Sequence, residues 1–481
     1  MKYVLAIDQS TQGTKALLFD ENLAVAAKAY LTHKQLVDER GYISHDGEEI
    51  FSNVIEVVRQ VVAKVNPRDI VCAGFCNQRE TAAIWDKIGK PLNKFVVWQC
   101  GRAAECIRNL QPYAEVVRQK TGLPLSPYFS AAKCKWLLEN TKGLPKEFYL
   151  GTVDSYLIYR LTGKFVTDVS NACRTQLLNI HTLQWDRELC SLFGVPMSAL
   201  ANIVPNDYDF GTTDFCGVLP DPVPVYASFG DSQAALFAQN CRRAGEVKAT
   251  YGTGSSVMMN TGKELVTSKN GLVNSVAWQI DGKTNYVLEG NINYTGAIVS
   301  WLKDDLRLIE SVSELEPLIE NANSDDETVF IPAFSGLSAP FWNDRIPAVV
   351  YGMRRTTRKE EFVKAAVESV AYQIHAVLCA MQEDTEKPIS VLRVDGAPTS
   401  NKFLMNLQSG LLGSPVEVSS LNELSAAGAA ILAGMKAGIY DKSIFEYLKY
   451  VDYVSHAEVE EKYRRWKKIV LIISERLIKR F

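Results

Sequence analysis

Short apolar runs and longer stretches of helical periodicity alternate along the chain. Residues 3–7, 15–19 and 24–30 are mostly apolar and are separated by polar turns, which predicts three β-strands within the first thirty residues. The turn at residues 20–22, Asp-Glu-Asn, is typical of a tight connection. A sheet that begins with a strand, turn and strand is therefore expected at the N-terminus.

A helix is expected to follow these strands. Asp46 stands where an N-cap residue is favoured, because its carboxylate can accept hydrogen bonds from the first backbone N–H groups of a helix. The apolar positions after it share one helical face: Ile50, Phe51, Val54, Val57, Val58, Val61 and Val62. The alternation of strands and helices predicts an α/β fold.

The second half of the chain repeats the pattern of the opening. Residues 246–251 predict a strand, residues 252–255 a small polar turn, and residues 256–259 the next strand. We interpret this as two related halves with a cleft between them, and expect the boundary near residues 239–244. The domains are then 1–240, with substrate binding and the first phosphate turn, and 241–481, with nucleotide binding.

The stretch 459–481 predicts a basic amphipathic helix. Such a helix can lie on a membrane surface or pack on its own domain, and we favour packing. No apolar run approaches the length of a membrane span, and the chain starts with a strand rather than a signal peptide. We expect no membrane partner.

Composition narrows the function classes. The 481 residues carry a net charge of −3, whereas a nucleic-acid platform is usually strongly basic, so no nucleic-acid partner is expected. The ten cysteines are scattered without a Cys-x-x-Cys pair, which argues against a zinc or redox motif. Cys72 and Cys76 fall in a predicted strand and are interpreted as packing residues. A reduced, cytoplasmic compartment fits these features.

Two polar turns have the chemistry of phosphate binding. Residues 8–15 read Asp-Gln-Ser-Thr-Gln-Gly-Thr-Lys, so backbone N–H groups and the Thr11 and Gln12 side chains can face phosphate oxygens while Lys15 balances charge. Asp8 can hold Mg²⁺ through water. An ordinary hairpin is the alternative for this turn alone. The second turn, residues 251–256, has similar chemistry at the matching place, and no Gly-Lys-Ser/Thr P-loop is present.

Asp231 is the candidate general base. It follows Gly230 at the predicted start of a helix, so it is either an N-cap or the group that takes the proton from an attacking hydroxyl. Phosphoryl transfer needs mainly positioning, charge neutralisation and one such base.

Four residues are candidates for binding vicinal hydroxyls. Arg79 and Glu80 offer fixed donors and acceptors, Trp98 can cover a carbon backbone, and Tyr128 can add a hydroxyl contact. The alternatives are a surface ion pair for Arg79 and Glu80 and core packing for the two aromatic rings.

These motifs together resemble the FGGY carbohydrate kinase family, and within it glycerol kinases. The resemblance covers nearly the whole chain, including a C-terminal signature from Ala348 through Gly352 and Glu361 to Glu368. The other matching segments are 77–81, 98–100, 127–130, 151–154, 179–183, 230–231, 251–254 and 392–396.

The resemblance implies an actin-like ATPase fold, with two ribonuclease-H-like domains and an interdomain cleft that holds ATP and substrate. It implies transfer of phosphate from ATP with Mg²⁺ to a polyol or sugar, first of all glycerol, giving glycerol 3-phosphate. Homodimers or homotetramers are usual in the family. The implied roles are Asp231 as base; Arg79, Glu80, Trp98 and Tyr128 for the polyol; Thr11, Gln12, Lys15 and Thr253 for phosphates; Asp8 for the metal; and Gly296 and Asn401 for the nucleotide.

The sequence departs from the glycerol kinase pattern at four of its expected binding positions. Ser232 and Ser256 replace a glutamine and a phenylalanine beside the expected polyol pocket, and Ser300 and Ala397 replace a glutamine and a glycine on the nucleotide side. Losing the phenyl ring leaves room for another hydroxylated carbon. A kinase for a four- or five-carbon polyol or ketose is therefore the alternative, and a non-catalytic ATP-binding sensor is a more distant one.

Overall fold

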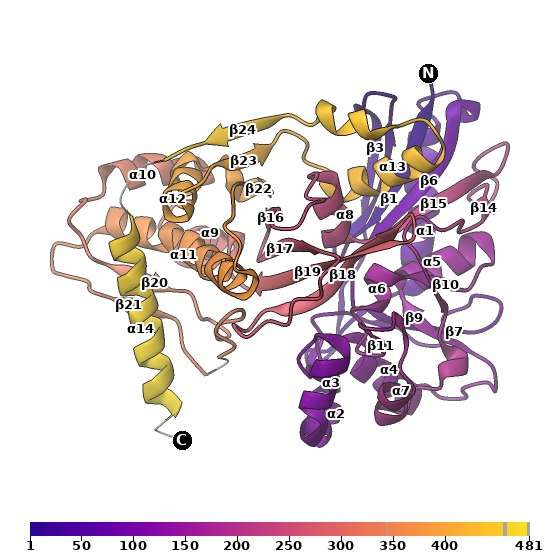
Figure 1. Cartoon of the computed structure of the whole chain (residues 1–481), viewed down its shortest axis with the longest axis horizontal. Coiled ribbons are helices and arrows are strands. Elements are labelled where there is room, and N and C mark those ends of the chain that lie inside the picture. The colour runs from indigo at the N-terminus through magenta and orange to yellow at the C-terminus, as the bar shows by residue number, and fades with distance from the viewer. Residues whose placement is uncertain (344, 456–458, 479–481) are drawn as a thin grey trace. The chain divides into compact units, whose positions relative to one another are not determined.

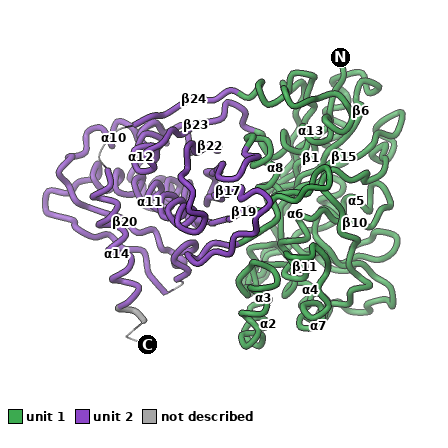
Figure 2. Tube along the Cα trace, viewed as in Figure 1, with its two compact units in different colours: residues 1–240, 274–286, 423–448 green, residues 241–273, 287–422, 449–481 purple. Residues whose placement is uncertain are grey.

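The computed structural model describes all residues except 344, 456–458 and 479–481. The chain forms two compact units (Figure 2). Unit 1 contains residues 1–240, 274–286 and 423–448, and unit 2 contains residues 241–273, 287–422 and 449–481. The first break along the chain thus follows Asn240, and two later segments return to unit 1.

Unit 1 is built on a six-stranded sheet with the order β14-β15-β6-β1-β2-β3 (Figure 1). The predicted opening is confirmed, because β1 pairs antiparallel with β2, and β2 with β3. β1 also pairs in parallel with β6, and β6 with β15. The bounds are β1 Tyr3–Gln9, β2 Gly13–Phe19, β3 Val25–Thr32, β6 Ile70–Asn77, β14 Thr212–Thr213 and β15 Val223–Gly230.

Helices cover this sheet. The predicted helix is confirmed as α1 (Gly47–Val62), and the Asp46 side chain accepts a hydrogen bond from the backbone N–H of Glu48. α13 (Leu424–Lys436) packs against β6, β1 and β15, and also against α8 (Asp231–Ala238). Cys72 and Cys76 are fully buried on β6, as their interpretation as packing residues requires.

The remainder of unit 1 carries a second sheet and a group of short helices. This sheet has the strand order β4-β5-β8-β7-β9, and α4 packs against β7. The bounds are β4 Leu36–Val37, β5 Ile43–His45, β7 Ala82–Trp85, β8 Phe95–Val96, β9 Tyr149–Thr152, α2 Ala104–Leu110, α3 Ala114–Thr121, α4 Ser130–Asn140, α5 Val153–Thr162, α6 Val169–Ala172 and α7 Arg187–Phe193. Two further strand pairs are β10 Val166–Asp168 with β13 Asn202–Val204, and β11 Leu178–Asn179 with β12 Gln184–Trp185.

Unit 2 repeats the hairpin of unit 1, as the sequence pattern predicts. β16 pairs antiparallel with β17 and in parallel with β22, just as β1 pairs with β2 and β6. The sheet order is β18-β19-β17-β16-β22-β23-β24, with residues 274–286 of its first hairpin assigned to unit 1. The strands are β16 Val247–Tyr251, β17 Ser255–Gly262, β18 Val273–Ile280, β19 Lys283–Ile292, β22 Leu392–Asp395, β23 Val416–Ser419 and β24 Tyr450–Tyr453.

The long helix α11 forms the centre of the unit 2 core, and most of its side chains are buried. This helix spans Lys359–Thr385, and other elements of unit 2 are α9 Gly296–Ser300, α10 Leu315–Asn321, β20 Val329–Ile331, β21 Val349–Tyr351 and α12 Lys402–Leu412.

The predicted C-terminal helix is present as α14 (Glu460–Ile478) and packs on its own unit. Trp466 is fully buried and its indole N–H donates to the Phe330 carbonyl at 2.9 Å. Residue 459 precedes the helix, and the end of the predicted range, 479–481, lies outside the described residues. Among the helices of the described residues, none combines the length and apolar composition that crossing a membrane requires.

The close packing of α13 on α8 predicts a defined effect for one glycine. A Cβ added at Gly428 would lie 2.1 Å from the Ala234 carbonyl oxygen, a backbone atom of α8. Overpacking of this kind costs about 1–3 kcal/mol. We expect Gly428→Ala to lower the melting temperature by a few degrees in differential scanning calorimetry. Gly101→Ala, where an added Cβ meets nothing within 4 Å, is the control. Equal melting temperatures for the two variants would contradict this packing.

Candidate active site

Three parallel strands bring the candidate catalytic residues to one edge of the unit 1 sheet. Gln9 of β1 and Gly230 of β15 both lie opposite Asn77 of β6. Because parallel strands end at the same edge, the chain segments that leave them start side by side. Asp8, Arg79 and Asp231 are therefore neighbours in space although the sequence separates them widely.

Asp231 opens α8 beside a buried arginine. The N-cap position is occupied by Gly230, so the alternative that Asp231 is the N-cap is wrong. One Asp231 carboxylate oxygen accepts from the Ser232 backbone N–H at 2.7 Å and lies 3.3 Å from Arg79 Nε. The Asp231 side chain remains 36% exposed, whereas that of Arg79 is 5% exposed. The solvent-accessible Asp231 carboxylate thus lies next to the buried guanidinium of Arg79.

The position of Arg79 is set by residues that the sequence analysis did not single out. The Nη1 of Arg79 donates to Oε1 of Gln233 at 3.2 Å, and Gln233 lies in the first turn of α8. A Cβ at Gly230 would come within 2.7 Å of Arg79 Cδ, so a glycine is needed where the arginine crosses the strand end. Gln233 follows Asp231 by two positions, and only the fold reveals which way its amide points.

Arg79 and Glu80 are not a surface ion pair, so that alternative is wrong. Both are buried, and each pairs with a different partner. Glu80 Oε1 lies 2.6 Å from Arg174 Nε, and Arg174 is fully buried. Arg174 was not predicted from the sequence, although a signal exists: it is the one Asp, Glu, Lys or Arg in residues 169–185. A lone charge in such a run is a candidate for a buried pair, because an unpaired buried charge is costly.

Trp98 and Tyr128 lie edge to face, with ring centroids 5.3 Å apart, and both are half-buried. The Trp98 indole N–H donates to Thr11 Oγ1 at 2.8 Å. Thr11 belongs to the first predicted phosphate turn, so this bond joins that turn to the aromatic pair. The structure therefore places Trp98 and Tyr128 beside the first turn within unit 1.

Lys15 is held by two carboxylates. Its ammonium lies 3.9 Å from Asp8 and 2.8 Å from Glu423, and Glu423 also pairs with Lys28. Burial disfavours the Lys15 ammonium, but Asp8 and Glu423 outweigh this effect and raise the pKa of Lys15. Glu423 immediately precedes α13 and was not predicted, since it lies 408 residues from Lys15.

Asp8 is a buried carboxyl with an elevated pKa. Burial raises the pKa of Asp8 to about 6, and the charges of Asp231 and Glu423 add to this, while Lys15 opposes it. Among the described residues, no group of three or more His, Cys, Asp or Glu side chains could hold a metal ion. Mg²⁺ commonly keeps several waters and uses only one or two carboxylates, so the Asp8 side chain fits that ion's chemistry.

The second predicted turn lies in unit 2 and gathers part of the candidate nucleotide site. The Gly296 N–H donates to the Gly252 carbonyl at 2.9 Å, and the Thr295 N–H to the Thr253 carbonyl at 2.9 Å. A Cβ at Gly296 would lie 2.7 Å from the Gly252 carbonyl oxygen. The turn thus holds Thr253 next to Gly296.

The other candidates of unit 2 lie on the elements that follow. Ser300 ends α9 and is exposed, Ala397 is exposed before α12, and the Asn401 side chain caps α12 by accepting from Leu404 N–H at 2.8 Å. Ser256 lies on β17, and its buried hydroxyl has no hydrogen-bond partner among the residues that the structure describes.

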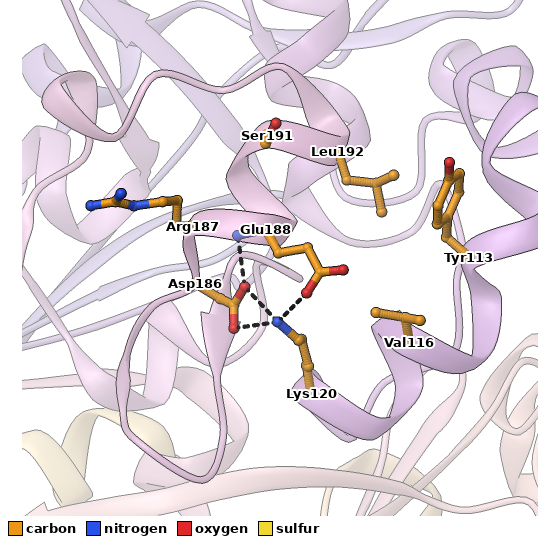
Figure 3. A pocket seen from close by; sticks show the side chains of 8 residues that line it. All are labelled: Tyr113, Val116, Lys120, Asp186, Arg187, Glu188, Ser191 and Leu192. Carbon is orange, nitrogen blue, oxygen red and sulfur yellow. Dashed lines mark hydrogen bonds and ion pairs between the residues drawn. The ribbon is translucent and has the colours of Figure 1, made fainter.

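A separate surface pocket of about 570 Å³ in unit 1 contains none of the predicted site residues (Figure 3). Lys120 lies within it, 3.0 Å from Asp186 and 2.6 Å from Glu188, so its charge is already paired. The lining residues are Tyr113, Val116, Lys120, Asp186, Arg187, Glu188, Ser191 and Leu192.

Unit 1 thus presents the accessible Asp231 carboxylate beside the buried Arg79, and each unit carries a small polar turn. Residues 3–238 match the N-terminal domain of the FGGY family of carbohydrate kinases, and residues 247–437 match its C-terminal domain. The chain belongs to this family, and it is a carbohydrate or polyol kinase similar to glycerol kinases. This membership favours an enzyme over an ATP-binding sensor.

Similar proteins support the class and the fold. The chain is 41% identical to "Glycerol kinase" of Geobacillus sp. (strain WCH70) and to "Glycerol kinase 2" of Thermotoga maritima, with 98% of each chain covered. The structure of Plasmodium falciparum glycerol kinase with ADP matches with a TM-score of 0.92 and 33% identity, over 98% of both chains. Xylulose kinase from Lactobacillus acidophilus shares the fold, with a TM-score of 0.87 and 20% identity over 99% of this chain and 97% of that one. The predicted actin-like two-domain ATPase fold is confirmed.

The raised pKa of Asp8 predicts a pH-dependent stability. Between the ordinary pKa of 3.8 and about 6 the folded state binds the proton more tightly than the unfolded state, so Asp8 lowers stability as pH rises through this window. Asp8→Asn removes the buried charge. We therefore expect its melting temperature to exceed that of the wild type by a few degrees at pH 7.5, with the difference gone near pH 4.

The control for this measurement is Asp221→Asn, since the Asp221 side chain is 75% exposed. Melting curves of both variants from pH 4 to 8 make the comparison. An Asp8→Asn protein that is no more stable than the wild type at pH 7.5 would rule out a destabilising Asp8 charge.

Proposed function

We propose that the enzyme transfers the γ-phosphoryl group of ATP to a hydroxyl of glycerol, forming glycerol 3-phosphate. The observation that carries this proposal is the Asp231 carboxylate, 36% exposed and 3.3 Å from the buried Arg79 guanidinium. The 41% identity to glycerol kinases over 98% of the chain supports glycerol as the first candidate.

In this proposal Asp231 is the general base. It accepts the proton of the attacking hydroxyl, while Arg79 holds its carboxylate in place through Nε. Arg79 and Glu80 bind neighbouring hydroxyls, and Ser232 adds a hydroxyl beside the base. Trp98 and Tyr128 cover the carbon backbone, because their rings are half-buried and leave one part accessible.

The proposed nucleotide residues lie on the two phosphate turns and on the elements that follow the second turn. Thr11, Gln12, Lys15 and Thr253 bind the phosphates, and Gly296, Ser300, Ala397 and Asn401 lie along the rest of the nucleotide. Kinases of this family use ATP, and the related Plasmodium falciparum structure is described as containing ADP. Mg²⁺, held through water by Asp8, would neutralise phosphate charge. Residues 1–240 then provide substrate binding and the first phosphate turn, and residues 241–481 provide nucleotide binding.

One observation favours a second candidate, a kinase of a four- or five-carbon polyol or ketose. The Ser256 hydroxyl is buried and has no partner among the described residues, and a buried hydroxyl normally has one. An additional substrate hydroxyl would supply this partner, and the absence of the phenylalanine leaves room for it. A site built to bind a hydroxyl discriminates more strongly than an apolar wall does.

A substrate panel tests both candidates. ADP release with MgATP is measured for glycerol, erythritol, threitol, xylitol, ribitol, xylulose and ribulose, and we expect glycerol to have the highest kcat/KM. Ser256→Phe should shift the ratio of kcat/KM roughly tenfold further toward glycerol. Ser256→Ala is the matched control, because it removes the hydroxyl without filling the space. Unchanged kcat/KM ratios in Ser256→Phe would argue against Ser256 as a polyol-binding residue. A higher kcat/KM for a longer compound than for glycerol would make that compound the proposed substrate instead.

A second test concerns the base. Asp231→Asn keeps the size of the side chain but cannot take a proton, so we expect kcat to fall at least about 100-fold. The melting temperature and the affinity for ATP should stay at wild-type values, as should all parameters of the exposed control Asp221→Asn. Near-normal turnover of Asp231→Asn would exclude Asp231 as the base.

A further inference from the structure

The proposed polyol residues are held by a second layer of buried polar side chains, to which the family resemblance gives no role. We propose that Lys133, together with Ser130 and Arg174, positions Glu80 and Tyr128 for the polyol. This inference rests on the proposed function and identifies positioning residues for that same site.

Lys133 is a fully buried lysine on the first turn of α4. Its ammonium donates to the Tyr128 carbonyl and, at 3.2 Å, to the Phe129 carbonyl. Both acceptors are backbone atoms of the segment that carries the Tyr128 ring. Lys133 thus fixes the main chain from which this ring extends.

Glu80 is held at both its backbone and its side chain. Its φ of 62° is in the left-handed region, which a glutamate seldom adopts, so the surroundings must maintain it. The Glu80 carbonyl accepts from Ser130 Oγ at 3.1 Å, and the carboxylate pairs with Arg174 at 2.6 Å. Arg174 in turn donates to Ser275 Oγ at 2.6 Å.

These two sets of contacts meet at Phe129. The Arg174 guanidinium lies over the Phe129 ring at 5.2 Å, while Lys133 binds the Phe129 carbonyl. Ser130, the next residue, binds Glu80. Glu80 and Tyr128 lie 48 positions apart in the sequence, yet a continuous set of buried contacts connects them, so a shift of one is transmitted to the other.

Burying the charge of Lys133 lowers the stability of the folded state. Burial lowers the pKa of Lys133 to about 7, and the nearby Glu80 carboxylate offsets only part of that effect. An apolar side chain of similar length would avoid this cost of burying a charge. Functional sites are where such local conflicts are expected, which agrees with a positioning role for Lys133.

The test separates positioning from general stability. Lys133→Met removes the ammonium and with it both hydrogen bonds to the backbone carbonyls. Lys133→Gln keeps an amide N–H donor that can reach toward these carbonyls. Ser130→Ala removes the hydrogen bond to the Glu80 carbonyl. Lys135→Met, on the same helix and paired with the exposed Glu139, is the control. Steady-state KM values for the polyol and for ATP, polyol affinity by calorimetry, and melting temperatures are measured on the full chain.

We expect Lys133→Met to raise the polyol KM roughly tenfold or more while the KM for ATP changes less than about twofold. Lys133→Gln should recover part of this loss, Ser130→Ala should raise the polyol KM in the same direction, and Lys135→Met should match the wild type. If Lys133→Met does not fold, the other two variants carry the comparison.

Two outcomes overturn the inference, and they are distinguishable. Wild-type polyol KM in the Lys133 and Ser130 variants, or equal rises of both KM values, rejects positioning while leaving the kinase proposal intact. A wild-type protein that neither binds nor phosphorylates any polyol of the panel rejects the proposed function and the positioning role together.

Discussion

The parallel register of β1, β6 and β15 is the constraint on which the candidate site depends. Gln9, Asn77 and Gly230 are opposite one another, so the residues that leave these strands begin in one place. In a strand, a slip of one residue turns every side chain to the other face. Such a slip in β1 would move Asp8 away from Lys15, and one in β15 would change where α8 starts. The close packing of α13 on α8 secures that start.

At this edge of the sheet, charged residues that are adjacent in the sequence form ion pairs with different partners. Arg79 pairs with Asp231, whereas Glu80 pairs with Arg174, because the left-handed backbone at Glu80 redirects the chain between them. The exposed carboxylate of Asp231 is thereby supported from the interior while remaining accessible. The second pair lies entirely in the interior, where a change of one partner would leave a buried charge uncompensated.

Local patterns made part of this molecule predictable. Periodicity and turn chemistry, which depend only on residues close together in the sequence, predict the hairpins of both units and the C-terminal helix. They also predict α1 with its Asp46 cap. The family motifs added Asp231, Arg79 and Glu80, but not the pairings of these residues. Arg174, Gln233 and Glu423 were missed because their partners lie far away in the sequence, and only tertiary packing decides such contacts.

Glu423 has a consequence for how tightly this edge can hold an anion. It binds Lys15 and Lys28 at the same time, so the positive charge of Lys15 is already compensated. Any phosphate that approaches Lys15 must compete with this carboxylate, and its affinity is reduced by the strength of the existing ion pair. For a catalyst, weaker binding of a charged ligand means faster release of that ligand and therefore a higher turnover rate where release is rate-limiting.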